Sequence, residues 1–359
     1  MLHIAVDLRP LLEPFESGVK VYTRAMVQAL LRRKDVELDL FYQAARPCPW
    51  IHQDFPQVRF LQRSNMWFHL RSLFAFPALR EVDFPQQPDL IWLPDRRPFF
   101  KGKIPLVMTV HDYVPEHFAG SFSFKSRLWH RIFSLPRLLS LCSGLLFPSQ
   151  SIADEFKGHG LPFVVTYEGA EVGQVQEKPA LLPDGRPFFL MIAPADPRKG
   201  LDFLCAIAEA RPDLFFVVAG LKTQEHRFSR LQLKFPPNVL ALGSFTEAEK
   251  TYLLKHAKAL LALSAYEGFD LPVLEAVQQA CPVILRDIPV HRELYAGEGF
   301  WVKTWQDILP LLDQTLPLPQ LRQSLSWDEA AQKALLFFRG VVGNKNSNTG
   351  GDGNGDYSA

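Results

Sequence analysis

Several features are scarce in this sequence of 359 residues, and each absence excludes a class of protein. The four cysteines stand far apart, at no spacing typical of a zinc site or a disulfide framework. Net charge is nearly absent, because 39 Lys and Arg residues oppose 38 Asp and Glu residues. No overall basic field therefore favours nucleic acid as a partner. The composition fits a reducing compartment.

Leader segments and long apolar runs are also missing. The start of the chain lacks the basic segment of a secretory signal, and its first apolar run stops at Asp7. No run is apolar and long enough to span a bilayer. No Gly-x-Gly-x-x-Gly follows an expected strand, which disfavours a nicotinamide-dependent dehydrogenase. We therefore expect a globular, cytoplasmic protein.

Short apolar and β-branched runs alternate with helical patterns along the chain. This alternation predicts the α/β class, with parallel sheets that are covered by helices on both faces. The expected strands are Leu2–Val6, Leu38–Tyr42, Leu90–Leu93, Leu106–Val110, Leu145–Pro148, Phe188–Ile192, Leu214–Ala219, Val239–Leu242, Ala259–Leu263 and Pro282–Leu285.

A cluster of Gly and Pro residues divides these strands into two series. We expect a first Rossmann-like domain over residues 1–167, a linker over 168–187 and a second Rossmann-like domain over 188–326. A helix-capping pattern predicts a terminal helix over 327–340 that packs back on the first domain. Residues 341–359 are rich in Asn, Gly, Asp and Ser, which predicts a disordered tail.

The most informative segment begins where the strand Ala259–Leu263 ends and reads Ser-Ala-Tyr-Glu-Gly-Phe-Asp-Leu-Pro-Val-Leu-Glu. Gly268 permits a tight turn, and Pro272 suits the first turn of a helix. A helix N-terminus there would offer N–H groups to a phosphate or a sugar hydroxyl. Taken alone, Glu267 and Glu275 are more simply a surface turn residue and a partner of the helix dipole.

With its neighbours, this segment resembles the donor-site signature of the retaining glycosyltransferases of family 4. The resemblance extends to about Phe338 and implies the GT-B fold, in which two Rossmann-like domains face each other across a cleft. The matching segments are Asp7-Leu8-Arg9-Pro10, Ser17-Gly18-Val19, Thr109-Val110-His111-Asp112, Pro197-Arg198-Lys199-Gly200, Leu242-Gly243, the segment Tyr266–Ala276 and Ile288-Pro289-Val290-His291-Arg292-Glu293.

The resemblance implies roles for the donor-side residues. Glu275 would bind the ribose hydroxyls of the donor nucleotide, and Glu267 would lie beside the transferred sugar. Arg198 and Lys199 would hold the diphosphate as its charge grows. The other implied donor contacts are the turn residues Gly268, Phe269, Asp270 and Leu271, the base-contacting loop with Gly243 and Ser244, and Gly18 at the first helix.

Further roles are implied for residues that follow the strand Leu106–Val110. By resemblance His111 lies near the donor sugar and is catalytic together with Glu267, Arg198 and Lys199. Asp112 either holds the imidazole or binds the acceptor, for which Tyr113 is a second candidate. The resemblance implies no metal and no other cofactor.

Two departures from the family pattern support an alternative. Ala193-Pro194 replaces the Gly-Arg that often follows the first strand of the second domain, and Asp270 replaces the second glycine of an E-G-F-G turn. Both changes make the surroundings of a diphosphate less favourable. The alternative is a catalytically silent sugar-nucleotide-binding or scaffold subunit of a glycan-assembly complex.

The function that the resemblance implies is transfer of a hexose from a nucleotide diphosphate sugar to a saccharide or lipid-linked saccharide of a cell-surface glycan. The D-L-R-P and I-P-V-H-R-E segments resemble the mannosyltransferase branch, so we expect GDP-mannose as the donor.

Two aromatic segments have two interpretations each. We expect Phe122–Arg137 to be a core-facing helix with a solvated basic edge, whereas the alternative is a helix on the inner face of an anionic membrane. The stretch Met66–Phe84 serves either packing or acceptor binding.

Overall fold

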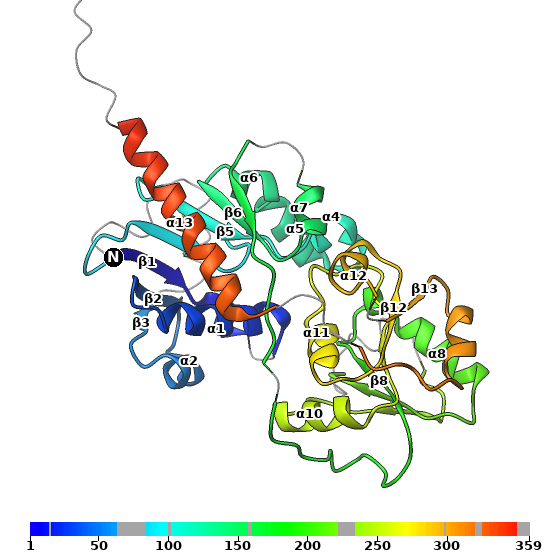
Figure 1. Cartoon of the computed structure of the whole chain (residues 1–359). Helices are drawn as coiled ribbons and strands as arrows, with labels where there is room; N and C mark the ends of the chain where they lie inside the picture. The colour runs from blue at the N-terminus through cyan, green and yellow to red at the C-terminus, as the bar shows by residue number, and fades with distance from the viewer. Residues whose placement is uncertain are drawn as a thin grey trace, which may run out of the picture. The chain divides into compact units, whose positions relative to one another are not determined.

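The computed structural model divides the chain into two compact units, one from Met1 to Glu168 with the terminal helix and one from Gly169 to Ser326 (Figure 1). It describes residues 1–13, 16–62, 84–99, 102–156, 160–171, 173–221, 234–297, 299–319 and 325–349. The aromatic stretch Met66–Phe84 lies outside the described residues except for Phe84, whose ring is buried against Phe41.

The first unit contains a parallel sheet in the order β3-β2-β1-β4-β5-β6-β7. The central strands β1, β4, β5 and β6 are buried along their whole length, which explains their continuous apolar runs. Strand order reverses beside β1, where open α/β sheets bind their ligands. The strands are β1 (Leu2–Asp7), β2 (Val36–Ala44), β3 (Arg59–Gln62), β4 (Leu90–Leu93), β5 (Leu106–Thr109), β6 (Gly144–Phe147) and β7 (Phe163–Val165).

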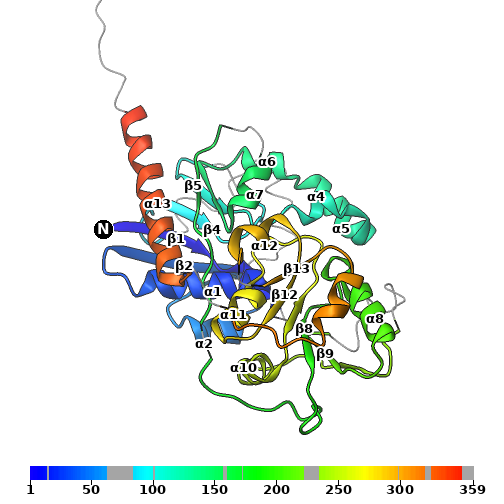
Figure 2. The ribbon, with the colours of Figure 1, turned by 45° about the vertical axis from the view of Figure 1, so that its right-hand side comes forward.

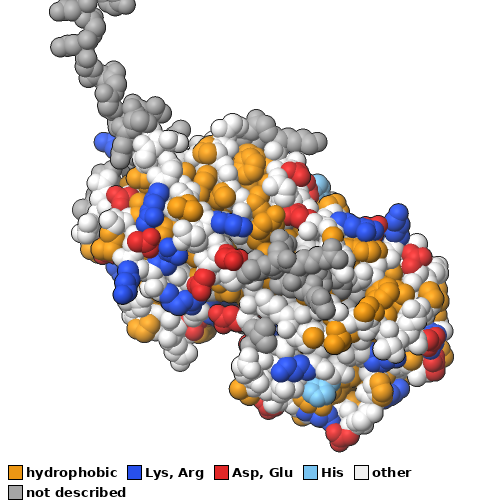
Figure 3. Space-filling model, viewed as in Figure 1, with side chains coloured by type: hydrophobic (Ala, Val, Ile, Leu, Met, Phe, Trp, Pro, Cys, Tyr) orange, Lys and Arg blue, Asp and Glu red, His pale blue; other side chains and the backbone are white. Residues whose placement is uncertain are grey.

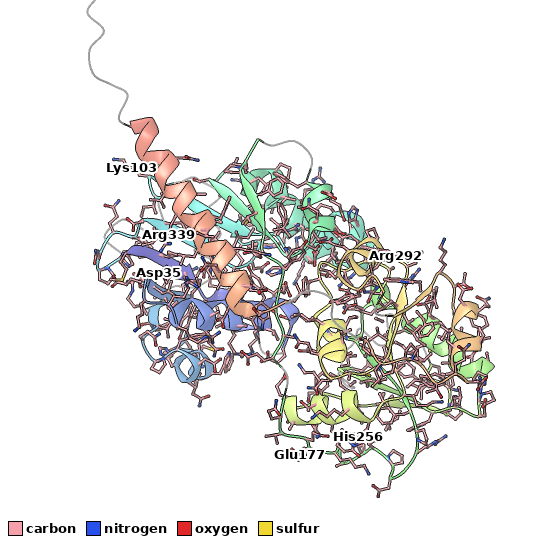
Figure 4. All side chains as sticks on the ribbon, in the orientation of Figure 1. Asp35, Lys103, Glu177, His256, Arg292 and Arg339 are labelled. Carbon is pink, nitrogen blue, oxygen red and sulfur yellow. The ribbon has the colours of Figure 1, made fainter. Side chains whose placement is uncertain are left out.

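The long terminal helix α13 belongs to this unit and packs against α1, which is distant from it in the sequence (Figures 1 and 2). Trp327 of α13 meets the ring of Tyr22 edge-on, and Arg339 of α13 binds Asp35 at 2.8 Å (Figure 4). The described helices are α1 (Gly18–Leu31), α2 (Pro49–Asp54), α4 (Val114–His117), α5 (Phe124–Ile132), α6 (Leu135–Leu139), α7 (Gln150–Glu155) and α13 (Trp327–Thr349), with short 3-10 turns η1 (Arg9–Leu12) and η3 (Ala119–Ser121).

The end of α13 corrects a prediction. The helix continues to Thr349 instead of ending near residue 340, so the expected disordered tail does not begin at 341. Buried side chains recur every three or four residues from Trp327 through Phe338 to Val341, and this spacing extends the apolar face of the helix past the predicted boundary. No proline interrupts the chain there.

The second unit contains a parallel sheet in the order β10-β9-β8-β11-β12-β13. Its strand order reverses between β8 and β11, so their carboxyl ends define the ligand-binding edge. The strands are β8 (Phe189–Ile192), β9 (Phe216–Ala219), β10 (Val239–Ala241), β11 (Leu260–Ala262), β12 (Val283–Arg286) and β13 (Phe300–Val302). The described helices are α8 (Leu201–Ala210), α10 (Glu247–His256), α11 (Leu271–Gln278) and α12 (Pro289–Leu294), with 3-10 turns η4 (Pro197–Lys199) and η5 (Gln306–Leu311).

The two parallel sheets confirm the predicted α/β class with two Rossmann-like domains. Every expected strand is present, with ends that differ by a few residues. Three short strands at or near sheet edges were not predicted, namely β3, β7 and β13. All three are outermost strands and are only partly buried, unlike the central strands.

The region around α5 corrects a second prediction. The expected single helix over Phe122–Arg137 is two helices, α5 and α6, because Pro136 fits only the first turn of a new helix. No residue of α5 is buried, so α5 is not the core-facing helix that we expected. Its side chain Phe124 is 74% exposed, and Leu128 is also exposed.

The described surface mixes charges of both signs, as the net charge of +1 requires; Figure 3 shows them interspersed on one face. Among the described residues, no helix combines the length and apolarity that a membrane crossing needs.

Candidate functional site

Two neighbouring loops of the second unit carry most of the predicted donor residues. η4 follows β8, and the segment from Ser264 to Asp270 follows β11, the strand next to β8. The loops are tied together because the backbone N–H of Ala265 donates to the carbonyl oxygen of Arg198 at 2.7 Å. The predicted cations and the predicted acidic turn therefore lie at the same edge of the sheet.

Gly200 allows this close approach. Its φ is +75°, and a Cβ atom at this position would lie 2.4 Å from the carbonyl oxygen of Leu263. Only glycine fits both the left-handed backbone and the space. The glycine of the P-R-K-G segment thus holds η4 against the end of β11.

Arg198 is fixed by an acidic residue that the sequence analysis did not single out. Asp196 caps η4, and its carboxylate accepts from Nη2 of Arg198 at 2.8 Å and from Nε at 3.1 Å. Nη1 of Arg198 donates to the carbonyl oxygen of Tyr266 at 3.3 Å. The guanidinium is therefore held in one orientation, directed at the turn before α11.

Lys199 binds Glu267, and both side chains are largely buried. Burial disfavours the ammonium, but the charges of Glu267 and Asp270 outweigh it and raise the pKa of Lys199 above its ordinary value. The lysine is therefore charged when no ligand is bound. Lys199, which the family resemblance assigns to the diphosphate, is thus a direct neighbour of Glu267, which it assigns to the sugar.

The turn from Gly268 to Leu271 presents mainly its backbone. The side chains of Phe269 and Leu271 are buried, so they anchor the turn. Asp270 is the N-cap of α11 in a left-handed conformation, with φ of 71°. Its carboxylate is turned to His291, a partner that removes the expected repulsion of an unpaired acid. The N-terminus of α11 lies directly after this turn.

Glu275 pairs with Lys250 of α10, whose Nζ lies 2.7 Å from Oε1. Burial raises the pKa of Glu275 above its ordinary value, and the charge of Lys250 opposes that rise. Lys250 also contacts Glu247 at 2.8 Å.

The loop with Gly243 and Ser244 precedes the same helix. The carbonyl oxygen of Gly243 accepts from the N–H of Gly220 at 3.0 Å, and Ser244 is exposed. A capping box of Thr246 and Glu249 then starts α10. The loop predicted to contact the base therefore leads into α10, and Lys250 of α10 binds Glu275, the carboxylate predicted to bind the ribose.

His111 of the first unit is buried directly after β5. Its Nε2 lies 2.8 Å from the carbonyl oxygen of Pro94, and its Nδ1 lies 3.6 Å from Oε1 of Glu168. The ring of Tyr22 meets the imidazole edge-on at 4.6 Å between centroids. Both ring nitrogens thus face oxygen acceptors of the protein.

Glu168 and His111 influence each other's pKa values. Burial disfavours the imidazolium, but the hydrogen bond and charge of Glu168 raise the pKa of His111. Burial likewise raises the pKa of Glu168, although His111 opposes this rise. Glu168 was expected to begin the linker, and it is instead a buried partner of a predicted catalytic residue.

The other predicted residues of the first unit have structural partners. Asp112 accepts from the N–H of Val114 at 2.9 Å and so forms the turn that starts α4. Tyr113 is buried, and burial raises its pKa. Gly18 is the first residue of α1, one turn before Tyr22, with open space where a Cβ atom would be.

Four residues beside the predicted ones were missed, and their sequence signals are weak. Asp196 before a proline is a helix-start pattern, and Glu168 stands between a strand and a glycine. Lys250 and His291 lie on helices, and the residues that they bind are distant in the chain. Within the described part of the chain, no group of three or more His, Cys, Asp or Glu residues is arranged to hold a metal ion.

Comparisons with known proteins identify the family. The model of "Glycosyltransferase Family 4" matches residues 17–173, and the model of "Glycosyl transferases group 1" matches residues 174–333. The two matches meet end to end and cover both sheets except for β1. The chain belongs to the glycosyltransferases of family 4.

Relatives in this family include mannosyltransferases. The chain is 30% identical over 172 residues to the serotype-specific mannosyltransferase WbdA of Escherichia coli, which covers 42% of this chain and 20% of WbdA. It is 25% identical over 220 residues to the O-antigen chain mannosyltransferase RfbU of Salmonella typhimurium, covering 58% of this chain and 60% of RfbU. The match thus spans about a fifth of WbdA and three fifths of RfbU.

A solved structure confirms the fold. Anabaena Alr3699/HepE, solved in complex with UDP and glucose, is similar with a TM-score of 0.60 and 16% identity, covering 98% of each chain. The architecture is that of the GT-B glycosyltransferases, with two Rossmann-like domains.

Proposed function

We propose that this chain is a retaining hexosyltransferase that moves mannose from GDP-mannose to a saccharide or lipid-linked saccharide in the synthesis of a cell-surface glycan. The observation that carries the proposal is the cluster of Arg198, Lys199 and Glu267 at the turn before α11. Two fixed cations and a helix N-terminus suit a diphosphate leaving group. The names of WbdA and RfbU support mannose as the sugar.

In the proposed reaction the bond between the anomeric carbon and the diphosphate oxygen breaks, and its electron pair leaves with the diphosphate. Arg198, Lys199 and the N–H groups of α11 stabilise the charge that develops there. The acceptor hydroxyl forms the new bond on the same face of the sugar and gives its proton to a leaving-group oxygen. Attack on the same face retains the configuration of the donor.

Glu267 has a positioning role in this scheme. In the ligand-free site it neutralises Lys199. When the diphosphate binds the ammonium of Lys199 in place of Glu267, the carboxylate of Glu267 can accept hydrogen bonds from the sugar hydroxyls. The turn Gly268–Leu271 contributes backbone groups beside it, and Glu275 accepts from the ribose diol.

We propose that His111 lies near the donor sugar, as the family resemblance implies. Because its ring nitrogens face Pro94 and Glu168, contact with the donor sugar requires it to exchange one of these partners. Asp112 and Tyr113 stay predicted acceptor contacts, and the cleft between the domains stays a prediction from the family resemblance.

A nucleotide panel tests the donor. A ligand present at about 100 times its dissociation constant stabilises a protein by about 2.7 kcal/mol, which is readily seen as a rise in melting temperature. We expect GDP and GDP-mannose to raise it more than UDP, ADP and their sugars. Stabilisation by UDP and not by GDP would refute GDP-mannose as the donor, and it would leave the proposal of a glycosyltransferase unchanged.

Product analysis tests the mechanism. Proton NMR of the earliest product should show the anomeric configuration of the donor, and transfer should continue in EDTA, because protein cations take the role of a metal. An inverted anomeric signal, or activity that EDTA abolishes and a divalent ion restores, would overturn the proposal.

One observation favours the second candidate, a silent sugar-nucleotide-binding subunit. Asp196 already occupies the guanidinium of Arg198, and Ala193-Pro194 supplies no further cation. Donor hydrolysis separates the two candidates, because a silent subunit binds the nucleotide sugar without releasing free sugar.

We also propose a peripheral membrane contact through α5. Its exposed Phe124, Leu128 and Trp129 stand among Lys125, Arg127 and Arg131, and the sequence holds no acidic residue between Glu116 and Asp154. Apolar side chains within a basic segment suit an anionic bilayer surface, where a lipid-linked acceptor would be found. On this proposal the protein works at the cytoplasmic face of the membrane.

Vesicle sedimentation tests this contact. The protein should sediment with vesicles that contain phosphatidylglycerol and not with pure phosphatidylcholine, and Phe124→Glu should release it. Leu336→Glu on α13 is the matched control, since Leu336 is also exposed. Equal sedimentation of the two variants would refute the assignment to α5.

A further inference from the structure

The histidine of α12 forms a buried connection to the turn before α11. Nε2 of His291 lies 2.8 Å from Oδ2 of Asp270, and the two side chains are 0% and 6% exposed. Nδ1 of His291 lies 2.8 Å from the carbonyl oxygen of Arg286, at the end of β12. The imidazole thus bridges a sheet strand and the turn.

Both ring nitrogens of His291 therefore face oxygen atoms. A carbonyl oxygen can only accept, so Nδ1 carries a proton. Nε2 either donates to an ionised Asp270 or accepts from a protonated one. The surroundings decide between these states, because Asp270 is close to the cations of Lys199 and Arg198 as well as to His291. Burial raises the pKa of Asp270, but the hydrogen bond from His291 and the charge of Lys199 bring it below its ordinary value.

The remaining charges near this pair have their own partners. Glu267 of the same loop binds Lys199, and Asp287 binds Arg292, the neighbour of His291 on α12. The guanidinium of Arg286 donates to the carbonyl oxygen of Leu263 and lies over the ring of Phe203. The ionised Asp270 therefore has His291 as its hydrogen-bonded partner among the described side chains.

The turn needs such a connection because of its backbone. Asp270 has φ of 71°, which costs a non-glycine residue about 1 kcal/mol or more unless its surroundings hold it. A second contact comes from the same helix, one turn later: the hydroxyl of Tyr295 donates to the carbonyl oxygen of Asp270 at 3.2 Å. α12 therefore holds this turn through a side chain and through its backbone.

We propose that His291 is a positioning residue whose hydrogen bonds to Asp270 and to the end of β12 fix the turn Gly268–Leu271 in the geometry that receives the donor sugar. The aspartate that departs from the family's glycine is then a built part of the site. The consequence for transfer rests on the proposed function, whereas the order of the turn does not.

Hydrogen exchange tests the positioning role without any substrate. In His291→Gln the amides of Gly268 to Val273 should exchange at least about tenfold faster than in the parent protein. The matched control is His256→Gln, the same change at an exposed histidine of α10 (Figure 4). Equal exchange in this segment for the two variants would overturn the proposal.

Kinetics then connect the turn to transfer. Turnover of His291→Gln should fall by about 10- to 100-fold, as a misplacement of about 1 Å allows, while the dissociation constant of GDP stays within about twofold. Absence of GDP binding in the parent protein would instead refute the proposed donor and leave the hydrogen-exchange result to decide the role of His291.

Discussion

The pair of Lys250 and Glu275 gives the sharpest test of the nucleotide site. We consider Lys250→Met, which keeps the length of the side chain and removes its charge. Glu275 is largely buried, so the change leaves its carboxylate without Lys250, its counter-ion among the described residues. Removing one partner of a buried pair costs about 3–5 kcal/mol, and slight exposure of both groups favours the lower end.

The loss depends on pH in a direction that the structure fixes. Burial already raises the pKa of Glu275, and without Lys250 it rises further. A carboxyl whose folded pKa lies above its unfolded value destabilises the fold increasingly as pH rises from the unfolded to the folded pKa, because only the unfolded state releases its proton in that range. The stability deficit of the variant should therefore be small at acidic pH, grow as pH rises, and level off above the folded pKa that Glu275 has in the variant.

Nucleotide binding should depend on pH in the opposite direction, because it is weakened where Glu275 is protonated. A hydrogen bond to a charged acceptor contributes about 1.5–3 kcal/mol, so a protonated Glu275 should weaken GDP binding by about tenfold or more. Calorimetric titrations between pH 6 and 8 measure this, with Lys255→Met, an exposed lysine of the same helix, as the control. If Lys250→Met binds GDP as tightly as Lys255→Met at every pH, the ribose assignment is refuted.

Three further predictions test other parts of the structure. Lys199→Ala should lower kcat by about 10²–10³-fold with a smaller effect on donor binding, and a change in KM alone would reduce Lys199 to a binding residue. Glu168→Gln should lower the pKa of His111, and its stability deficit in denaturant melts should shrink as pH rises and the imidazolium of the parent is lost. Gly200→Ala should cost clearly more than the ~1 kcal/mol expected for Gly185→Ala, because only the first Cβ meets a carbonyl oxygen, at 2.4 Å; equal costs in urea titrations would contradict the packing of η4.

Local pattern was sufficient for the framework and for the loops of the site. Central strands of a parallel sheet are apolar on both faces, so β1, β4 and β6 appear as continuous runs that no helix periodicity imitates. Because ligand loops follow such strands, Arg198, Lys199 and the turn before α11 were found at the correct edge.

The partners of these residues were beyond sequence reasoning. Glu168 is far from His111 in the chain, and Lys250 is separated from Glu275 by a strand and two loops. A charged residue on a helix is usually solvated, so nothing local distinguishes Lys250 from Lys255. Only the packing of α10 against α11 determines which lysine is buried.

The error at α5 has a similar origin. An amphipathic pattern indicates that one helix face prefers an apolar environment, but it does not say whether protein or lipid supplies it. Core-facing was the commoner case, and the exposed Phe124 shows that this helix is different.

The charge pairs of the second unit suggest how a donor enters a site that is already neutralised. Asp196 is bound to Arg198 through the cap of η4 as well as through the guanidinium, so it stays in place when a diphosphate arrives. Glu267 has no such backbone connection among its described contacts, and its partner is the single ammonium of Lys199. In the proposed reaction, a diphosphate that binds the ammonium of Lys199 frees Glu267 to contact the sugar. Binding of the leaving group and orientation of the sugar are then coupled. Lys199→Ala should for this reason disturb sugar recognition as well as turnover.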